Sequence, residues 1–335
     1  MGLLGTAAAP SAVADQSDAG QLRVTIGAAP RAQANGFAAG PASNATCTIN
    51  KITVNRYSEC EWVSIHVDVI KIINGKPELE GTVDFDVKHQ MTLKVNSANW
   101  SEKFHVSKAR TTRAAAVSPS TSPPLPQAAP RPRSTSRSHI LSSSAADGTV
   151  GYTTSIAPKK INPKAKTTYA YTFTKPGYSP GSVTYNSAVY RCDNYYGSSK
   201  ASRAGCAVPD VPTGVSMVGL ARIDEGIRKL RASGGHYGDP NGGKPLHWMI
   251  NKKQEDANRK AVCPSSAPAD MKRAGRTSCD EYPFASSREG GTHLPAKQRE
   301  ITWVKVQENK SQGGRITAWR GQMHVMDGDP FYVIA

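Results

Sequence analysis

The hydrophobic periodicity of this chain changes once, near residue 214, and that change constrains the fold more than any other feature of the sequence. Upstream, apolar and polar residues alternate, as in strands that bury one face. Downstream, Leu220, Ile223, Ile227 and Leu230 recur at spacings of three and four residues, which predicts an amphipathic helix. We therefore expect a multidomain protein in which an all-β region precedes an α+β domain.

The β-rich region is predicted over residues 46–213. Its alternating runs are Val63 to Val69, Val83 to Val87, Met91 to Val95, Tyr169 to Phe173 and Val183 to Tyr185. Asn74-Gly75 separates the first two runs and is a strong hairpin signal. We expect a single sandwich-like domain, and two separate small β units are the alternative.

Three segments have little to bury. Residues 1–14 end in Ala12-Val13-Ala14, which is typical of a cleavage site, so this segment is either a truncated signal peptide or a disordered leader. Residues 15–45, rich in Ala, Gly, Pro and Ser, are predicted to be disordered. Residues 110–147, rich in Pro, Ser and Arg, are predicted to be a disordered insertion in the β-rich region. No run approaches the ~20 apolar residues that span a bilayer, so we expect no membrane partner.

The C-terminal domain is predicted over residues 214–335 and mixes helices with strands. After the first helix and a glycine-rich break, its elements follow at short intervals. They are expected to be a polar helix from about Leu246 to Val262, a short strand at Val304 and Val306, a helix through Ile316, Trp319 and Met323, and a strand from Phe331 to Ile334.

The chain is strongly basic, because 42 Lys and Arg against 26 Asp and Glu give a net charge of +16. Such an excess favours polyanionic partners, namely nucleic acids, acidic glycans or anionic membrane surfaces. The alternative is that the charge serves solubility alone. Charge therefore supports nucleic-acid binding without selecting it.

The cysteines form three pairs that are close in sequence and lack the spacing of zinc or redox motifs. The simplest arrangement joins Cys47 to Cys60, Cys192 to Cys206, and Cys263 to Cys279. Disulfides of this kind persist in oxidising compartments, so we expect a secreted, extracellular protein.

The densest signal for chemistry is an acidic cluster near the C-terminus. Asp280 and Glu281 are adjacent, and Glu289 precedes a pair of glycines. Carboxylates gathered in this way suit a hard divalent cation such as Mg²⁺ or Mn²⁺. Taken by spacing alone, an acidic turn followed by a solvated Glu explains the pattern equally well.

The segment CDEYPFASSREGG, from Cys279 to Gly291, resembles the signature of the NucA/NucB deoxyribonuclease family. Glu308-Asn309 and the helical segment that follows are similar to the second motif of the family, although Glu308 stands where an Asp is usual. The basic segment ANRKAVC and the last strand also match. The resemblance covers about residues 246–335 and says nothing about residues 15–210.

The resemblance implies a secreted, non-specific DNA endonuclease that needs a divalent metal, Mg²⁺ or Mn²⁺. The implied core is a ββα-metal arrangement similar to that of His-Me finger nucleases, with a carboxylate in place of the histidine base. Asp280 is then the expected base, and Glu281 could share that role. Asn309 is the expected metal ligand, and Glu289 is expected to be a second ligand or to orient a metal-bound water.

Four basic residues near these motifs are expected to bind DNA phosphates without reading the base sequence. They are Arg288, Lys310, Arg315 and Arg320. For any one of them the alternative is a plain surface charge.

Three hypotheses for the function remain open. The first is an exported nuclease that degrades extracellular DNA. The second is an exported envelope-binding or adhesin-like β protein with an inactive nuclease-like domain. The third is a nuclease toxin effector that an immunity protein keeps harmless to its producer. On the first, removal of residues 1–210 is expected to leave turnover intact.

Overall fold

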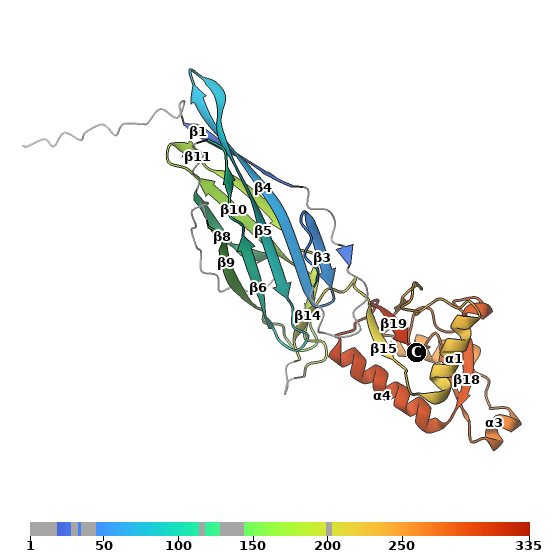
Figure 1. The fold of residues 1–335 in the computed structure, drawn as a ribbon. Coiled ribbons are helices and arrows are strands. Elements are labelled where there is room, and N and C mark those ends of the chain that lie inside the picture. Colours follow the sequence, from blue (N-terminus) through green and yellow to red (C-terminus); the bar gives the residue numbers. More distant parts are fainter. Residues whose placement is uncertain (1–18, 28–32, 35–44, 114–117, 128–143, 199–202) are drawn as a thin grey trace, which may run out of the picture.

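The computed structural model describes residues 19–27, 33–34, 45–113, 118–127, 144–198 and 203–335, with backbone only for 33–34 and 118–127. The chain is mostly β with few helices, and an elongated β-rich region leads into a smaller C-terminal domain (Figure 1). The predicted signal peptide over 1–14 lies outside the described residues.

The larger sheet of the β-rich region has the strand order β11-β1-β4-β5-β6-β9, with β2, β3 and β7 paired at its sides. Its strands are β1 (Gly20–Ile26), β2 (Gln33–Ala34), β3 (Lys51–Asn55), β4 (Ser58–Ile73), β5 (Lys76–Thr92), β6 (Asn99–Val106), β7 (Arg110–Thr111), β9 (Ala146–Thr153) and β11 (Tyr178–Ser179). Strands β4 and β5 form a long hairpin that turns at Asn74 and Gly75, with φ of 50° and 73°. Positive φ at both positions is what an Asn-Gly turn provides.

The second sheet has the order β12-β10-β13-β14, and β8 also pairs with β10. Its strands are β8 (Ser118–Gln127), β10 (Ile161–Thr174), β12 (Gly181–Asn186), β13 (Tyr190–Asp193) and β14 (Gly205–Ala207). Apolar side chains of the two sheets form one buried cluster, in which the rings of Phe85 and Phe173 lie 5.7 Å apart. The two sheets therefore pack face to face, as in a sandwich.

The structure differs from the sequence prediction in two segments that were expected to be disordered. Strand β1 lies within residues 15–45, where Leu22 is buried and β1 pairs with β4. Strand β8 lies within residues 110–147 and pairs only with β10. An edge strand of this kind forms main-chain hydrogen bonds on one side, so it tolerates proline and needs few apolar residues.

The C-terminal domain places its helices around two small sheets. Its elements are β15 (Thr213–Ser216), α1 (Ala221–Ala232), β16 (Leu246–His247), α2 (Lys252–Val262), α3 (Ala269–Arg273), β17 (Ser278–Tyr282), β18 (Glu300–Val304), α4 (Val306–Gln322) and β19 (Pro330–Ile334). One sheet has the order β15-β19-β16, and β17 with β18 forms an antiparallel hairpin that leads directly into α4. The predicted first helix is present as α1, which buries Ile223, Ile227 and Leu230.

Two predicted boundaries in this domain are displaced. The polar helix does not begin at Leu246, because that residue belongs to β16; α2 begins after Asn251, whose side chain accepts a hydrogen bond from the Gln254 N–H. Asn is a favoured N-cap residue, and this contact explains the start of the helix. Val306 does not continue the strand of Val304 but opens α4.

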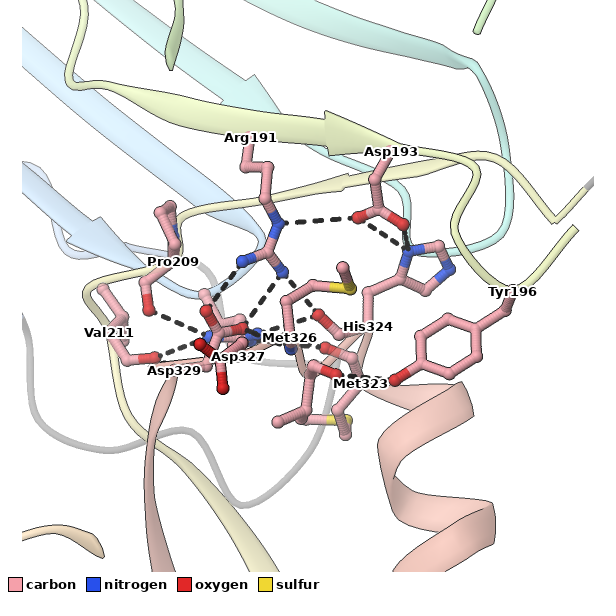
Figure 2. A network of polar contacts seen from close by, with 12 residues as sticks. Arg191, Asp193, Tyr196, Pro209, Val211, Met323, His324, Met326, Asp327 and Asp329 are labelled. Atoms are coloured by element: carbon pink, nitrogen blue, oxygen red, sulfur yellow. Dashed lines mark hydrogen bonds and ion pairs between the residues drawn. The ribbon is translucent and has the colours of Figure 1, made fainter. Parts of the chain in front are cut away.

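The β-rich region and the C-terminal domain share a buried interface. Ile52 and Tyr57 from the first belong to the same apolar cluster as Val215 and Phe331 from the second. The guanidinium of Arg56 is fully buried there. It donates to the main-chain oxygens of Pro209, Val211, Met323 and His324 and to the Asp329 carboxylate, within the polar network of Figure 2.

Among the described residues, no helix combines the length and the apolar character that a membrane span requires.

Candidate active site

A cavity of about 230 Å³ opens between α2, α4 and the β17 strand. It brings together four of the residues that the sequence predicted for the site, namely Asp280, Glu281, Asn309 and Arg320. The other residues that line it are Trp248, Glu255, Arg259, Phe284, Ala285, Ser286, Gln312, Gly313, Ile316 and Thr317. Polar and charged side chains of both signs therefore converge on one hollow of the C-terminal domain.

Strand β17 holds the two adjacent carboxyl groups. Asp280 pairs with Thr302 and Glu281 with Ile301 in the hairpin, so the backbone of both is fixed by a neighbouring strand. Each carboxyl residue is 5% exposed. Successive side chains of a strand point to opposite faces, so the two carboxyl groups have different partners.

The two carboxyl groups have perturbed acidities. Burial raises the pKa of Asp280 to about 8, and the charge of Glu281 adds to this shift, while the nearby Gln312 amide opposes it. Burial also raises the pKa of Glu281, although Arg259 counteracts the effect with its charge and a hydrogen bond. The Arg259 Nε lies 3.0 Å from Glu281 Oε1. Asp280 is thus a buried acid that titrates near neutral pH.

Helix α4 places Asn309 against the start of the hairpin. Its amide Nδ2 donates to Ser278 Oγ at 2.8 Å and to the Cys279 carbonyl at 3.1 Å. Both amide hydrogens are therefore used, and the amide oxygen is the atom that remains for a ligand.

The three disulfides of the structure are those that the sequence predicted. They join Cys47 to Cys60, Cys192 to Cys206, and Cys263 to Cys279. The third ties the end of α2 to β17, immediately before Asp280. It therefore anchors the strand that carries both buried carboxyl groups.

Glu289 lies apart from this cavity. Its carboxylate accepts a hydrogen bond from the His247 main-chain N–H at 2.8 Å and lies 2.7 Å from His247 Nδ1. The next residue, Trp248, does line the cavity, and it also bridges to Ser287. Glu289 consequently fixes the segment that carries Trp248 rather than facing Asp280 directly.

The four predicted phosphate-binding residues occupy different settings. Arg320 lines the cavity, and its guanidinium lies 4.3 Å from the Trp248 ring centroid. Arg288 pairs with Asp327 at the surface, and Lys310 is exposed. Arg315 donates to the main-chain oxygens of Val218 and Ser216, so it supports the loop before α1.

The sequence interpretation did not single out Arg259, Gln312 or Trp248. Gln312 follows Asn309 by three residues, and Ile316 and Arg320 continue the same helical face. That spacing was a usable signal, since positions three or four apart share a helix face. Arg259 and Trp248 offered no such signal, because they enter the cavity from separate segments.

The geometry defines a class of site. A buried carboxyl pair that faces amide oxygens and guanidinium groups is suited to hydrolysis of a phosphate ester. Residues 239–334 match the family model described as Deoxyribonuclease NucA/NucB, so the C-terminal region of this chain is a NucA/NucB deoxyribonuclease domain. Comparison of the chain with curated proteins and with solved structures gave no match.

Proposed function

We propose that this protein is a secreted DNA endonuclease that cleaves phosphodiester bonds with little sequence preference and with the help of a divalent metal. The observation that carries the proposal is the convergence of Asp280, Glu281, Asn309 and Arg320 on one cavity within the NucA/NucB domain. Nucleases of this family are typically secreted, and three disulfides are compatible with an extracellular protein.

The donor set of the cavity fits a hard divalent cation. Its candidate ligands are oxygen atoms, namely the Asn309 amide oxygen and the buried carboxyl groups. Mg²⁺ and Mn²⁺ prefer such ligands. The raised pKa of Asp280 also fits, because a nearby cation would offset the cost of a buried negative charge.

We assign the metal to Asn309, with further oxygen ligands from water and substrate. When bound, the cation would stabilise negative charge on the phosphate and on the leaving oxygen. We propose that the β17–β18 hairpin and α4 form the ββα-metal core implied by the sequence resemblance.

Asp280 is proposed to accept a proton from the attacking water. A general base works best when its pKa lies near the operating pH, and burial brings the pKa of Asp280 to about 8. Glu281 is held by Arg259, so we propose that it tunes the charge of the site and shares the proton with Asp280. Arg320 is proposed to bind a phosphate oxygen at the edge of the cavity.

Glu289 is proposed to support the site through the segment that carries Trp248, since its carboxylate is bound to His247. A single cavity lined by Asp280, Asn309 and Gln312 argues against the alternative of a degenerate, inactive nuclease-like domain.

The proposal is tested by incubating the purified protein with plasmid DNA and Mg²⁺ or Mn²⁺. We expect a smear of fragments without discrete bands, and no cleavage when EDTA is added. Asp280→Asn and Asn309→Ala should each lower the rate by about a hundredfold or more, as loss of a general base does. Asp270→Asn is the matched control, because Asp270 is an exposed acid of the same domain. Full activity of Asp280→Asn would refute Asp280 as the base.

A further inference from the structure

A loop of the β-rich region reaches the helix that carries Asn309. The loop connects β13 to β14 and is closed by the Cys192–Cys206 disulfide. Its Tyr196 hydroxyl donates to the Val325 carbonyl at 2.6 Å, just beyond the end of α4. The Tyr196 ring also stands edge-on to His324, with centroids 5.7 Å apart (Figure 2). This loop is therefore fixed against the nuclease domain.

Contacts continue from this loop into the candidate active site. Burial raises the pKa of the Tyr196 hydroxyl, and the neighbouring Arg320 guanidinium opposes that shift by its charge and a hydrogen bond. Arg320 in turn stacks on Trp248, and both line the cavity of Asp280. A series of contacts thus leads from the cavity through Arg320 and Tyr196 to the β-rich region.

Basic residues of the β-rich region gather around one buried amide in the same loop. Asn194 is 2% exposed. Its carbonyl accepts from the Lys159 N–H, its N–H donates to the Lys160 carbonyl, and its side-chain oxygen accepts from the Arg203 N–H, at 3.0, 3.0 and 2.9 Å respectively. Asn194 therefore holds the backbone of three basic residues in one place.

The side chains of these three residues are exposed, and none of them forms an ion pair within the described parts of the chain. Lys159 instead lies over the ring of Tyr195, 5.7 Å from its centroid, and Tyr195 packs edge-on against Tyr196. An unneutralised basic cluster next to aromatic rings is typical of surfaces that bind a nucleic-acid backbone.

We propose that Lys159, Lys160 and Arg203 form a second contact surface for the DNA backbone, which continues the path from the active-site cavity across Arg320 and Tyr196. This inference rests on the proposed nuclease function and names how its substrate is held. The cavity accommodates only the reacting phosphate and its neighbours, so a duplex must extend over the protein surface beyond it. Contacts to phosphates give affinity without base preference, which suits a non-specific enzyme.

The test compares two triple variants of the full chain. The first carries Lys159→Ala, Lys160→Ala and Arg203→Ala. The control carries Lys71→Ala, Lys76→Ala and Lys108→Ala, three exposed lysines that lie along the β4–β5 hairpin and after β6, away from the nuclease domain. Both remove the same charge, so a general electrostatic effect would appear equally in each.

Binding is measured by fluorescence anisotropy with a labelled 30-base-pair duplex in EDTA, over a series of salt concentrations. We expect the first variant to raise Kd about tenfold at low salt and to reduce the slope of log K against log salt by roughly 2 to 3, because each phosphate that the protein neutralises contributes about 0.9 to that slope. The control should stay near wild type. Equal Kd and slope for the two variants would overturn the proposal.

Cleavage with Mg²⁺ separates this inference from the nuclease function. The first variant should keep the wild-type kcat on an 8-base-pair duplex, which is too short to reach both surfaces, and should show a raised KM only on long DNA. A lysine-to-arginine variant at positions 159 and 160 should restore the affinity. If the wild type binds DNA through this surface but never cleaves it, the proposed function fails while the contact surface stands.

Discussion

Arg191 of the β-rich region and Asp329 of the nuclease domain form a buried bidentate ion pair, with Nη1 2.7 Å from Oδ1 and Nη2 3.0 Å from Oδ2 (Figure 2). Arg56 binds the same carboxylate as a second guanidinium partner. Burial by itself would raise the pKa of Asp329, but Arg56 and Arg191 outweigh it and hold the pKa below its ordinary value. One carboxylate thus compensates two buried guanidinium groups across the interface.

This relationship predicts that Asp329→Ala is strongly destabilising. The variant leaves Arg56 and Arg191 buried without their counter-ion, and the loss of one partner from such a pair costs about 3–5 kcal/mol. Asp327→Ala is the matched control, because its pair with Arg288 is exposed and is worth about 1 kcal/mol or less. Urea unfolding measures both. Equal losses in the two variants would show that the buried pair does not stabilise the interface.

Arg320 and Arg315 lie on the same helix and are predicted to differ in function. Arg320→Met should raise KM for DNA about tenfold, equivalent to about 1.4 kcal/mol, because Arg320 lines the cavity. Arg315→Met should leave KM nearly unchanged, since its guanidinium is bound to the Val218 carbonyl at 2.7 Å. Steady-state cleavage of a defined duplex distinguishes them. A larger KM effect at Arg315 would reverse the assignment.

The Cys263–Cys279 disulfide is predicted to support catalysis as well as stability. Replacing both cysteines with Ala should lower the free energy of unfolding by about 3 kcal/mol, as expected for a loop of this length, and should also lower kcat at a temperature where the variant is folded. The reason is that the bridge anchors β17 next to Asp280. The same replacement of Cys47 and Cys60 is the control and should cost stability without lowering kcat. Unchanged kcat in the first variant would limit the bridge to a purely structural role.

Local signals in the sequence predicted much of the fold. The β4–β5 hairpin followed from strict alternation and an Asn-Gly turn, and α1 followed from apolar residues at helical spacing. The disulfides were predictable because each joins cysteines 13 to 16 residues apart. Strands β1 and β8 were not predicted, since one lies among Ala, Gly and Pro and the other depends on main-chain pairing with β10.

The candidate site was predictable only where its residues share a motif. Asp280 and Glu281 are neighbours in sequence, whereas Arg259 reaches Glu281 from a helix 22 residues earlier. The interface was out of reach for the same reason: Arg56 and Asp329 are 273 residues apart, and in sequence each resembles an ordinary surface charge. Contacts between distant segments depend on the whole topology, and periodicity carries no record of them.

Glu61 on β4 is fully buried in the sandwich, and neither carboxyl oxygen has a hydrogen-bond partner among the described residues. Burial raises its pKa to about 10, and the charges of Glu59 and Glu102 add to the shift. His89 is its cross-strand neighbour but is bonded to Glu102. Between about pH 4.5 and 10, the folded protein therefore keeps a proton at Glu61 that the unfolded chain has lost.

Because the folded state binds the extra proton, the free energy of unfolding should fall as pH rises through this window, by up to about 1.4 kcal/mol per pH unit for one proton. Glu61→Gln removes that proton uptake, so the variant should gain stability relative to wild type from pH 5 to pH 9. Glu78→Gln is the control, because Glu78 is an exposed acid of β5 and should leave the pH dependence unchanged. Urea unfolding at pH 5, 7 and 9 measures all three proteins. Parallel curves for wild type and Glu61→Gln would mean that Glu61 does not hold a proton in the folded state.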